Sequence, residues 1–256
     1  MTSRSRLSTL ACAAGILFSI STTYARVVTF SVYEFRRSSD FQGSVEKLQV
    51  GDEVHVDYAD PKELVVFKLD ALLPEGTQGR VFKARNQKGE VVAVKFQRKS
   101  EDAGVAMKLE VQGIDYLEKM KIPVVKILRH DSDFYIEKEL IDGDTLQDTL
   151  LNWTELSKAD QDARMKELVN FFGLVSRPGT SISDLNAYNI MWDKNQSIWK
   201  IIDPGTVQFA MDVEENVVEM NKAIDEVGPH EMSTTFHAMF EKAKLLSDCI
   251  ARQIAK

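Results

Sequence analysis

Two acidic residues and an asparagine in the second half of the chain have the types and spacing of a site for metal-assisted chemistry. Asp184 and Asn189 stand five positions apart, and Asp203 follows an apolar run and precedes a Pro-Gly pair. Carboxylate and amide oxygens suit Mg²⁺, so one side chain of the first pair can face a substrate hydroxyl while the other faces a metal ion. The alternative is that these residues only form turns, a common role of Asp and Asn.

A glycine turn and a strand lysine in the first half of the chain could hold phosphate groups. Gly76 and Gly79 lie between two strand-like runs, and glycine lets backbone amides approach phosphate oxygens without interference from a Cβ atom. Lys95 alternates with apolar residues in the strand-like run 91–96. Taken alone, the glycines could serve a hairpin turn and Lys95 could be a solvated strand lysine. Along the chain, however, the glycine turn comes first, then the lysine and then the acidic residues. A nucleotide phosphotransferase needs this order.

The motifs together resemble those of the protein-kinase-like superfamily. Residues 74–96 are similar to its glycine-rich loop and third strand, with Pro74 in place of the first glycine, and residues 184–191 are similar to its catalytic loop. The resemblance covers about residues 68 to 210. It implies an α+β, two-lobed protein-kinase-like fold with a β-rich N-lobe and a reduced helical C-lobe. Because only about fifty residues follow Asp203, the chain looks most like the compact kinases among secreted bacterial effectors.

The resemblance implies which residues would perform the transfer. Asp184 would orient or deprotonate the acceptor hydroxyl, and Asn186 would hydrogen-bond beside it in the place of the lysine common in the family. Asn189 and Asp203 would hold Mg²⁺. Most of the rate would come from positioning and charge neutralisation rather than from covalent chemistry.

A site for ATP is implied in the same way. Lys95 would contact the α and β phosphates and form a half-buried ion pair with a glutamate of the helix predicted over residues 101–120. Glu110 fits the family spacing best, and Glu101 and Glu118 are alternatives on the same helix. Backbone groups of residues 139–141 would contact the adenine edge. The resemblance implies these further nucleotide contacts: Gly76, Gly79, Val81, Ala93, Glu139, Ile141 and Met191.

Several positions depart from the family pattern. Ser183 replaces the arginine beside the catalytic Asp, which removes the usual partner of a phosphorylated activation loop, so switching by that route is not expected. Pro204 replaces the phenylalanine that follows the metal-binding Asp, so no aromatic switch is expected there. Lys138 occupies the gatekeeper position, where a charged residue is unusual.

The pattern of apolar residues changes near residue 141. Strand character is expected over 26–70, 124–129 and 133–141, and helices over 155–175, 211–226 and 232–254. We therefore expect the N-lobe to comprise residues 26–141 and the C-lobe residues 142–256.

The first 25 residues are predicted to be a signal peptide. Arg4 and Arg6 precede an apolar run over residues 7–20, which is too short to span a bilayer comfortably, and residues 23–25 resemble a small-x-small cleavage site. We expect cleavage after Ala25, secretion of the mature chain and no stable membrane insertion after cleavage. The alternative is an uncleaved tail.

Composition narrows the classes of partner. The formal net charge of −7 argues against nucleic acid as the main partner, because binding to phosphates needs a basic surface. The chain has two cysteines, Cys12 and Cys249, and the first lies in the predicted signal peptide, so we expect no disulfide framework.

The sequence thus predicts an ATP- and Mg²⁺-dependent kinase that transfers the γ-phosphate of ATP to a hydroxyl, preferentially of a protein Ser or Thr. Millimolar ATP is a cytosolic resource, so an exported kinase is expected to act as an effector on a protein inside another cell, such as a host cell. The alternatives are a pseudokinase that serves as an interaction module, a kinase of a small molecule, and an enzyme that transfers AMP. Lys95, Asp184, Asn189 and Asp203 are present together, which argues against the pseudokinase, since a scaffold has no chemical need for all four.

Overall fold

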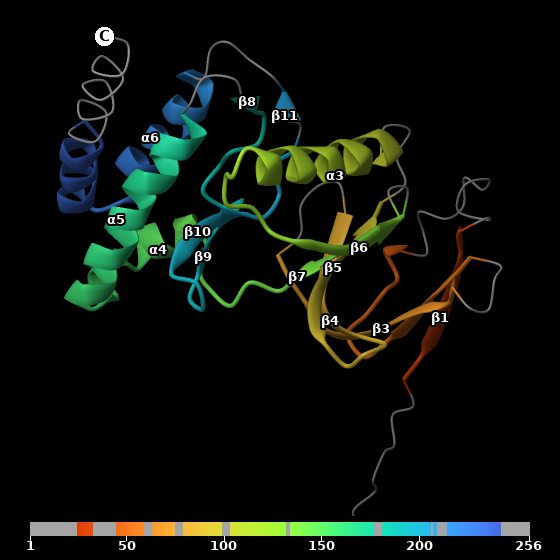
Figure 1. The fold of residues 1–256 in the computed structure, drawn as a ribbon. Coiled ribbons are helices and arrows are strands. Elements are labelled where there is room, and N and C mark those ends of the chain that lie inside the picture. Colours follow the sequence, from red (N-terminus) through yellow and green to blue (C-terminus); the bar gives the residue numbers. More distant parts are fainter. Residues whose placement is uncertain are drawn as a thin grey trace, which may run out of the picture.

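The molecule consists of a β-sheet with one flanking helix and of a group of helices beside a small hairpin (Figure 1). The structure, a computed structural model, describes residues 25–32, 45–58, 63–74, 79–98, 103–131, 134–176, 181–205, 207–208 and 214–241. The predicted α+β fold with a β-rich part and a smaller helical part is confirmed. The helices are α3 (Ala103–Lys119), α4 (Leu146–Leu151), the short 3₁₀ helix η3 (Trp153–Glu155), α5 (Lys158–Val175) and α6 (Glu214–Val227), followed by a helical stretch over 230–241.

Seven strands form one sheet in the order β1-β2-β3-β4-β5-β7-β6. The strands β1 and β2 are parallel, and all other neighbours are antiparallel. In β2 every second residue is buried, as expected for a strand with one face on a core. The strands are β1 (Val27–Ser31), β2 (Glu53–Asp57), β3 (Val65–Leu72), β4 (Gly79–Asn86), β5 (Val91–Gln97), β6 (Ile127–Asp131) and β7 (Tyr135–Glu139).

One face of this sheet is covered by a cluster of aromatic rings. Phe67 packs edge-on against Phe96, with ring centroids 6.0 Å apart, and against Tyr135 at 5.4 Å. Phe30 of β1 joins the cluster through Phe134, at 5.1 Å. Such pairs add to the free energy gained from burying the rings. The segment after residue 26 is therefore tied into the sheet, which agrees with the strand character expected from residue 26 onward.

The strand β5 explains how a lysine comes to face the interior. Val92, Val94 and Phe96 belong to the aromatic core, so the residues between them point to the opposite face of the sheet. On that face Lys95 is paired with Val81 of β4 on one side and with Ile136 of β7 on the other. The register of three strands thus sets the position of Lys95.

The second core lies in the helical part and also includes Ile114 and Leu117 of α3. The hairpin of β9 (Ile190–Asp193) and β10 (Ile198–Ile201) is built into this core. Trp192 and Trp199 pack edge-on at 5.4 Å, and the Trp199 indole donates to the carbonyl oxygen of Arg164 in α5 over 3.0 Å. At the start of α4, Thr145 and Asp148 form a reciprocal capping box. The loop of residues 183–189, directly before the hairpin, is therefore attached to a packed core.

The helices agree with the sequence-based expectations where the structure describes them. Helix α3 matches the prediction over 101–120, and α5 and α6 match those over 155–175 and 211–226. The last predicted helix, 232–254, is described as far as residue 241. The signal peptide up to residue 24, both cysteines and Gly76 lie outside the described residues, so these predictions stay predictions.

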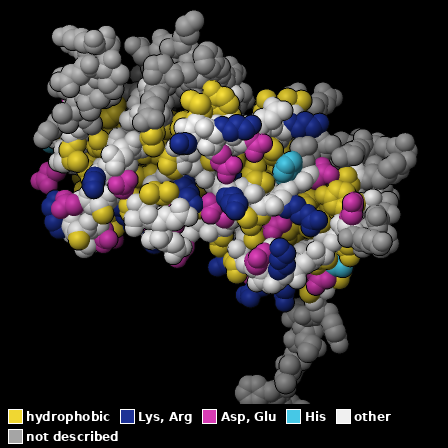
Figure 2. Space-filling model, in the orientation of Figure 1, with side chains coloured by type: hydrophobic (Ala, Val, Ile, Leu, Met, Phe, Trp, Pro, Cys, Tyr) yellow, Lys and Arg dark blue, Asp and Glu magenta, His cyan; other side chains and the backbone are white. Residues whose placement is uncertain are grey.

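No helix among the described residues is long and apolar enough to cross a lipid bilayer. On the face shown in Figure 2, side chains of Lys and Arg are interspersed with those of Asp and Glu, so the described part of that face carries no block of a single sign.

Candidate active site

A buried ion pair joins the sheet to α3. Lys95 Nζ lies 2.6 Å from Glu110 Oε2, and the two side chains are 5% and 2% exposed. The expectation of a half-buried pair is therefore wrong, because the sheet and α3 enclose both groups. Glu118, one of the alternatives, is exposed, and Glu101 lies outside the described residues. The geometry selects Glu110 as the partner of Lys95.

The same lysine contacts Asp203. Lys95 Nζ lies 2.7 Å from Asp203 Oδ2, and the Asp203 side chain is 32% exposed. Lys95 therefore lies between one buried carboxylate and one that reaches the surface. Gly79 of β4 leaves room for this arrangement, since a Cβ atom there would stand 2.8 Å from the carbonyl oxygen of Phe96 and 3.1 Å from Lys95 Cγ.

A second lysine approaches Glu110 from β7. Lys138 Nζ donates to Glu110 Oε1 and, over 2.9 Å, to the carbonyl oxygen of Ile202. The sequence placed Lys138 at the gatekeeper position but did not predict these contacts. There was no clear signal for them in the sequence, because β7 reads YIEKE and a lysine between two glutamates is typical of a solvated strand.

These contacts shift the acid–base properties of the site. Burial alone would lower the pKa of Lys95, but the Coulomb attraction of Glu110 and Asp203 and the hydrogen bonds to them outweigh it and raise that pKa. Burial alone would raise the pKa of Asp203, but the charges of Lys95 and Lys138 lower it on balance. Lys95 is therefore cationic and Asp203 anionic at neutral pH, as contact with phosphate and with a metal ion would require.

The loop between β8 (Ser181–Ile182) and β9 is organised by Asn186. Its amide donates to Asp184 Oδ1 over 2.6 Å, and its Oδ1 accepts from the backbone N–H groups of Tyr188, at 3.0 Å, and Asn189, at 3.1 Å. The Asn189 amide in turn donates to the carbonyl oxygen of Asp184 over 3.0 Å. Asp184 itself is exposed. The loop thus holds one carboxylate in a set direction at the surface.

The Asp203 loop and the Asp184 loop lie against each other. Ile202 N donates to the carbonyl oxygen of Asn189 over 2.8 Å. Gly205 has a φ of +56°, and a Cβ atom there would stand 2.9 Å from Asp184 Cβ. Glycine is required at this position for both reasons. The two acidic residues that the sequence singled out are therefore brought to one place.

The oxygen atoms at this junction fit a hard divalent cation. The amide nitrogen of Asn189 is engaged with Asp184, which leaves its oxygen as the ligand atom, and Asp203 supplies a carboxylate. No group of three or more His, Cys, Asp or Glu residues among those described could hold a metal by itself. A Mg²⁺ ion here would take further ligands from water and phosphate, which is how Mg²⁺ is commonly bound.

The other predicted nucleotide contacts fall into two groups. Val81 and Ala93 are half-buried on the Lys95 face of the sheet, and Gly79 lies against Lys95 itself. Met191 is half-buried at the start of the hairpin, next to Thr145. These residues come from the sheet part and from the helical part.

A third buried lysine, Lys200, forms ion pairs at the segment of residues 139–141, which joins the sheet part to the helical part. Lys200 Nζ lies 2.8 Å from Glu139 Oε1 and 3.0 Å from Asp193 Oδ2. The N–H of Glu139 donates to the carbonyl oxygen of Lys126, so its predicted adenine contact can involve only its carbonyl group. The side chain of Ile141, the other predicted hinge contact, is buried in the core of the helical part.

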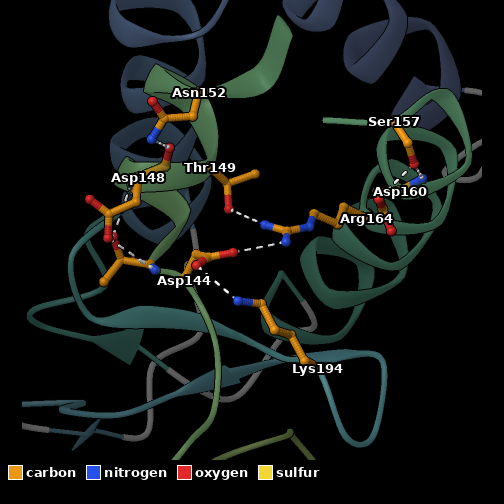
Figure 3. A network of polar contacts seen from close by, with 9 residues as sticks. Asp144, Asp148, Thr149, Asn152, Ser157, Asp160, Arg164 and Lys194 are labelled. Atoms are coloured by element: carbon orange, nitrogen blue, oxygen red, sulfur yellow. Dashed lines mark hydrogen bonds and ion pairs between the residues drawn. The ribbon is translucent and has the colours of Figure 1, made fainter. Parts of the chain in front are cut away.

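A polar network holds the end of this segment. Figure 3 shows Arg164 reaching from α5 to the Asp144 carboxylate, at 2.8 Å, and to the Thr149 hydroxyl, also at 2.8 Å. Lys194 approaches Asp144 from the hairpin, at 3.2 Å. Burial would raise the pKa of Asp144, but these two cations lower it. A cavity beside Arg164 is lined by Asp148 and Glu155, among others, and by none of the predicted site residues.

The family assignment follows from a comparison with family models. The model described as the protein kinase domain matches residues 67–224, which is more than half of the chain. A comparison with curated proteins gives no match. The matched residues include both parts of the molecule and every polar site residue discussed above. The chain therefore belongs to the protein kinase domain family.

Proposed function

We propose that this phosphotransferase moves the γ-phosphate of ATP to a Ser or Thr hydroxyl of a protein, with the residues above in the roles that the sequence suggested. The observation that carries the proposal is the contact of Lys95 with both Glu110 and Asp203 beside the Asp184 loop. In such a site one lysine can hold phosphate oxygens while an adjacent carboxylate holds a metal ion.

In the proposed mechanism each residue positions one component. Lys95 binds the α and β phosphates, and Glu110 orients Lys95. Asp184 accepts the proton of the acceptor hydroxyl at one of its carboxylate oxygens, and Asn186, which donates to its Oδ1, fixes the direction of that carboxylate. A bound Mg²⁺, held by Asn189 and Asp203, would supply neutralisation of the developing charge on the phosphates.

The exposure of the Asp184 loop favours a macromolecular acceptor. Asp184 is exposed and the neighbouring Tyr188 is 65% exposed. Sites for small molecules are usually concave and bury most of the ligand. An exposed carboxylate next to an exposed aromatic ring is better suited to a hydroxyl on a protein chain, and this supports the preference for Ser or Thr of a protein over a sugar.

The test is incubation of the purified protein with γ-labelled ATP, Mg²⁺ and a panel of protein and small-molecule acceptors, followed by mass spectrometry of the products. Phosphate on Ser or Thr is the expected modification. Phosphate on Tyr alone, phosphate on small molecules alone, or AMP on the acceptor would each overturn the Ser/Thr proposal. Binding of ATP without any transfer would favour the interaction module.

The enzyme is expected to be active without phosphorylation of its own chain. Ser183 stands where the family has an arginine that receives a phosphorylated loop, and Lys95, Glu110 and Asp203 already lie in contact. Treatment with a phosphatase should leave the turnover number unchanged. A freshly purified enzyme that the phosphatase silenced would contradict this expectation.

We also propose that the mature enzyme is secreted and acts as an effector inside another cell. The basic start, the apolar run and the small-x-small site before Arg26 support this proposal. N-terminal sequencing of the protein recovered from the culture medium or periplasm should find Arg26 first. An intact Met1 on exported protein would contradict it.

A further inference from the structure

Lys138 contacts two other parts of the candidate site at once. From β7 it reaches the Glu110 carboxylate of α3 and the carbonyl oxygen of Ile202, the residue directly before Asp203. The side chain is 9% exposed. A single ammonium group therefore links the last strand of the sheet part, α3 and the loop that carries Asp203.

With Lys138, the two carboxylates of the site are matched by two ammonium groups. Lys138, Glu110, Lys95 and Asp203 form a continuous row of contacts in which positive and negative groups alternate. Each Glu110 oxygen has its own ammonium partner. Because a buried charge is costly unless it is paired, a neutral residue at 138 would leave Lys95 alone to serve two carboxylates.

The position could have been apolar. Ile136, two residues earlier on the same face of β7, is fully buried, and an apolar side chain at 138 would fill the space without the cost of removing a charge from water. The ammonium group is instead placed on Glu110, which indicates that the contact has a use beyond packing.

That use follows from the proposed function, on which this inference rests. Lys95 is held by two carboxylates in the structure, yet it must contact the phosphates when ATP binds. We propose that Lys138 is a positioning residue, a second counter-ion that keeps Glu110 and thereby α3 in place while Lys95 contacts the nucleotide. Helix α3 then depends less on Lys95 and needs no separate activating event to hold it.

The test is a double-mutant cycle. Lys138→Met keeps an unbranched side chain, one atom shorter, and removes its charge. Glu110→Gln removes the charge that Lys138 is proposed to neutralise. Wild type, both single variants and the double variant are compared by calorimetry of Mg-ATP binding and by steady-state kinetics. Lys68→Met, which changes an exposed lysine of β3 in the same sheet, is the matched control.

We expect Lys138→Met to lower kcat/KM for ATP by about tenfold, which corresponds to ~1.4 kcal/mol, and to weaken Mg-ATP binding. In the Glu110→Gln background the same substitution should change either quantity by less than about twofold, because its target charge is gone. If the role of Lys138 were merely structural, its substitution would lower kcat/KM and Mg-ATP binding by the same factor in both backgrounds. Lys68→Met should match the wild type.

Equal losses in both backgrounds, or unchanged binding and kinetics in Lys138→Met, would overturn the proposal. If the Met variant did not fold, Lys138→Gln, which keeps a hydrogen-bond donor without the charge, would take its place in the cycle. If the wild type bound Mg-ATP but transferred no phosphate, the proposed function would fail, and the binding arm of the cycle would still decide the role of Lys138.

Discussion

Lys95 Nζ lies 2.7 Å from Asp203 Oδ2, although the two residues are 108 positions apart in the chain. The contact brings a strand of the sheet part to a loop of the helical part. A lysine suited to phosphate oxygens and a carboxylate suited to a metal ion thus meet at the junction of the two parts, where a nucleotide would be held by both.

Asp203→Asn tests the carboxylate at this junction. The change keeps the size of the side chain but removes the charge that holds Mg²⁺ in the proposed mechanism, so transfer should fall by roughly 100-fold or more while the protein stays folded. Turnover is measured at saturating Mg²⁺ and folding by circular dichroism. Retention of about a tenth of the wild-type turnover would contradict the assignment, since a metal ligand contributes more than that.

Asn186→Ala tests how the Asp184 carboxylate is held. The change removes the hydrogen bond to Asp184 Oδ1 and those from the N–H groups of Tyr188 and Asn189. A misdirected carboxylate should lower kcat by about tenfold or more, whereas KM for ATP should change little because the nucleotide contacts are intact. Steady-state kinetics with varied ATP separate the two constants. A rise in KM for ATP with unchanged kcat would place Asn186 in the nucleotide site instead.

Gly79→Ala tests the space beside Lys95. The new Cβ atom would stand 2.8 Å from the carbonyl oxygen of Phe96 and 3.1 Å from Lys95 Cγ, so the strand or the lysine must shift. We expect kcat/KM for ATP to fall by at least about tenfold. Gly173→Ala is the control, because no atom lies within 4 Å of its added Cβ on the exposed face of α5. It should leave kcat/KM unchanged and stabilise the fold by about 0.5–1 kcal/mol in urea denaturation.

The Asp52 carboxylate should make the stability of the sheet part depend on pH. Burial raises the pKa of Asp52, but hydrogen bonds from Arg26, at 2.9 Å, and from the N–H of Gln49, at 2.8 Å, lower it on balance. Since the folded pKa is lowered, the ionised group stabilises the fold above the ordinary pKa of about 3.9, and this contribution is lost as the pH falls through the folded value.

Arg26→Gln should therefore lower the midpoint of thermal unfolding near neutral pH, and the difference from the wild type should shrink below about pH 4. Lys158→Gln, which removes one partner of an exposed ion pair on α5, should have little effect at any pH. A constant difference between Arg26→Gln and the wild type from neutral to acidic pH would show that the Asp52 charge is not responsible.

Features that depend on short spacing along the chain could be predicted from the sequence alone. Alternation in β5 placed Lys95 opposite the apolar face, because successive strand residues point to opposite sides. The spacing of Asp184, Asn186 and Asn189 closes a loop through hydrogen bonds between residues two to five positions apart. Such contacts need no information about the rest of the fold.

Which charged groups far apart in the chain form ion pairs could be read only from the folded molecule. Glu110 rather than Glu118 meets Lys95 because α3 packs against the sheet in one rotation, which periodicity leaves open. Lys138 reaches Glu110 because β7 lies next to β5 in the sheet, an order that the chain does not follow. The sheet, α3 and the Asp203 loop together exclude water from these charges. The charges are therefore buried only after all three elements have packed against one another.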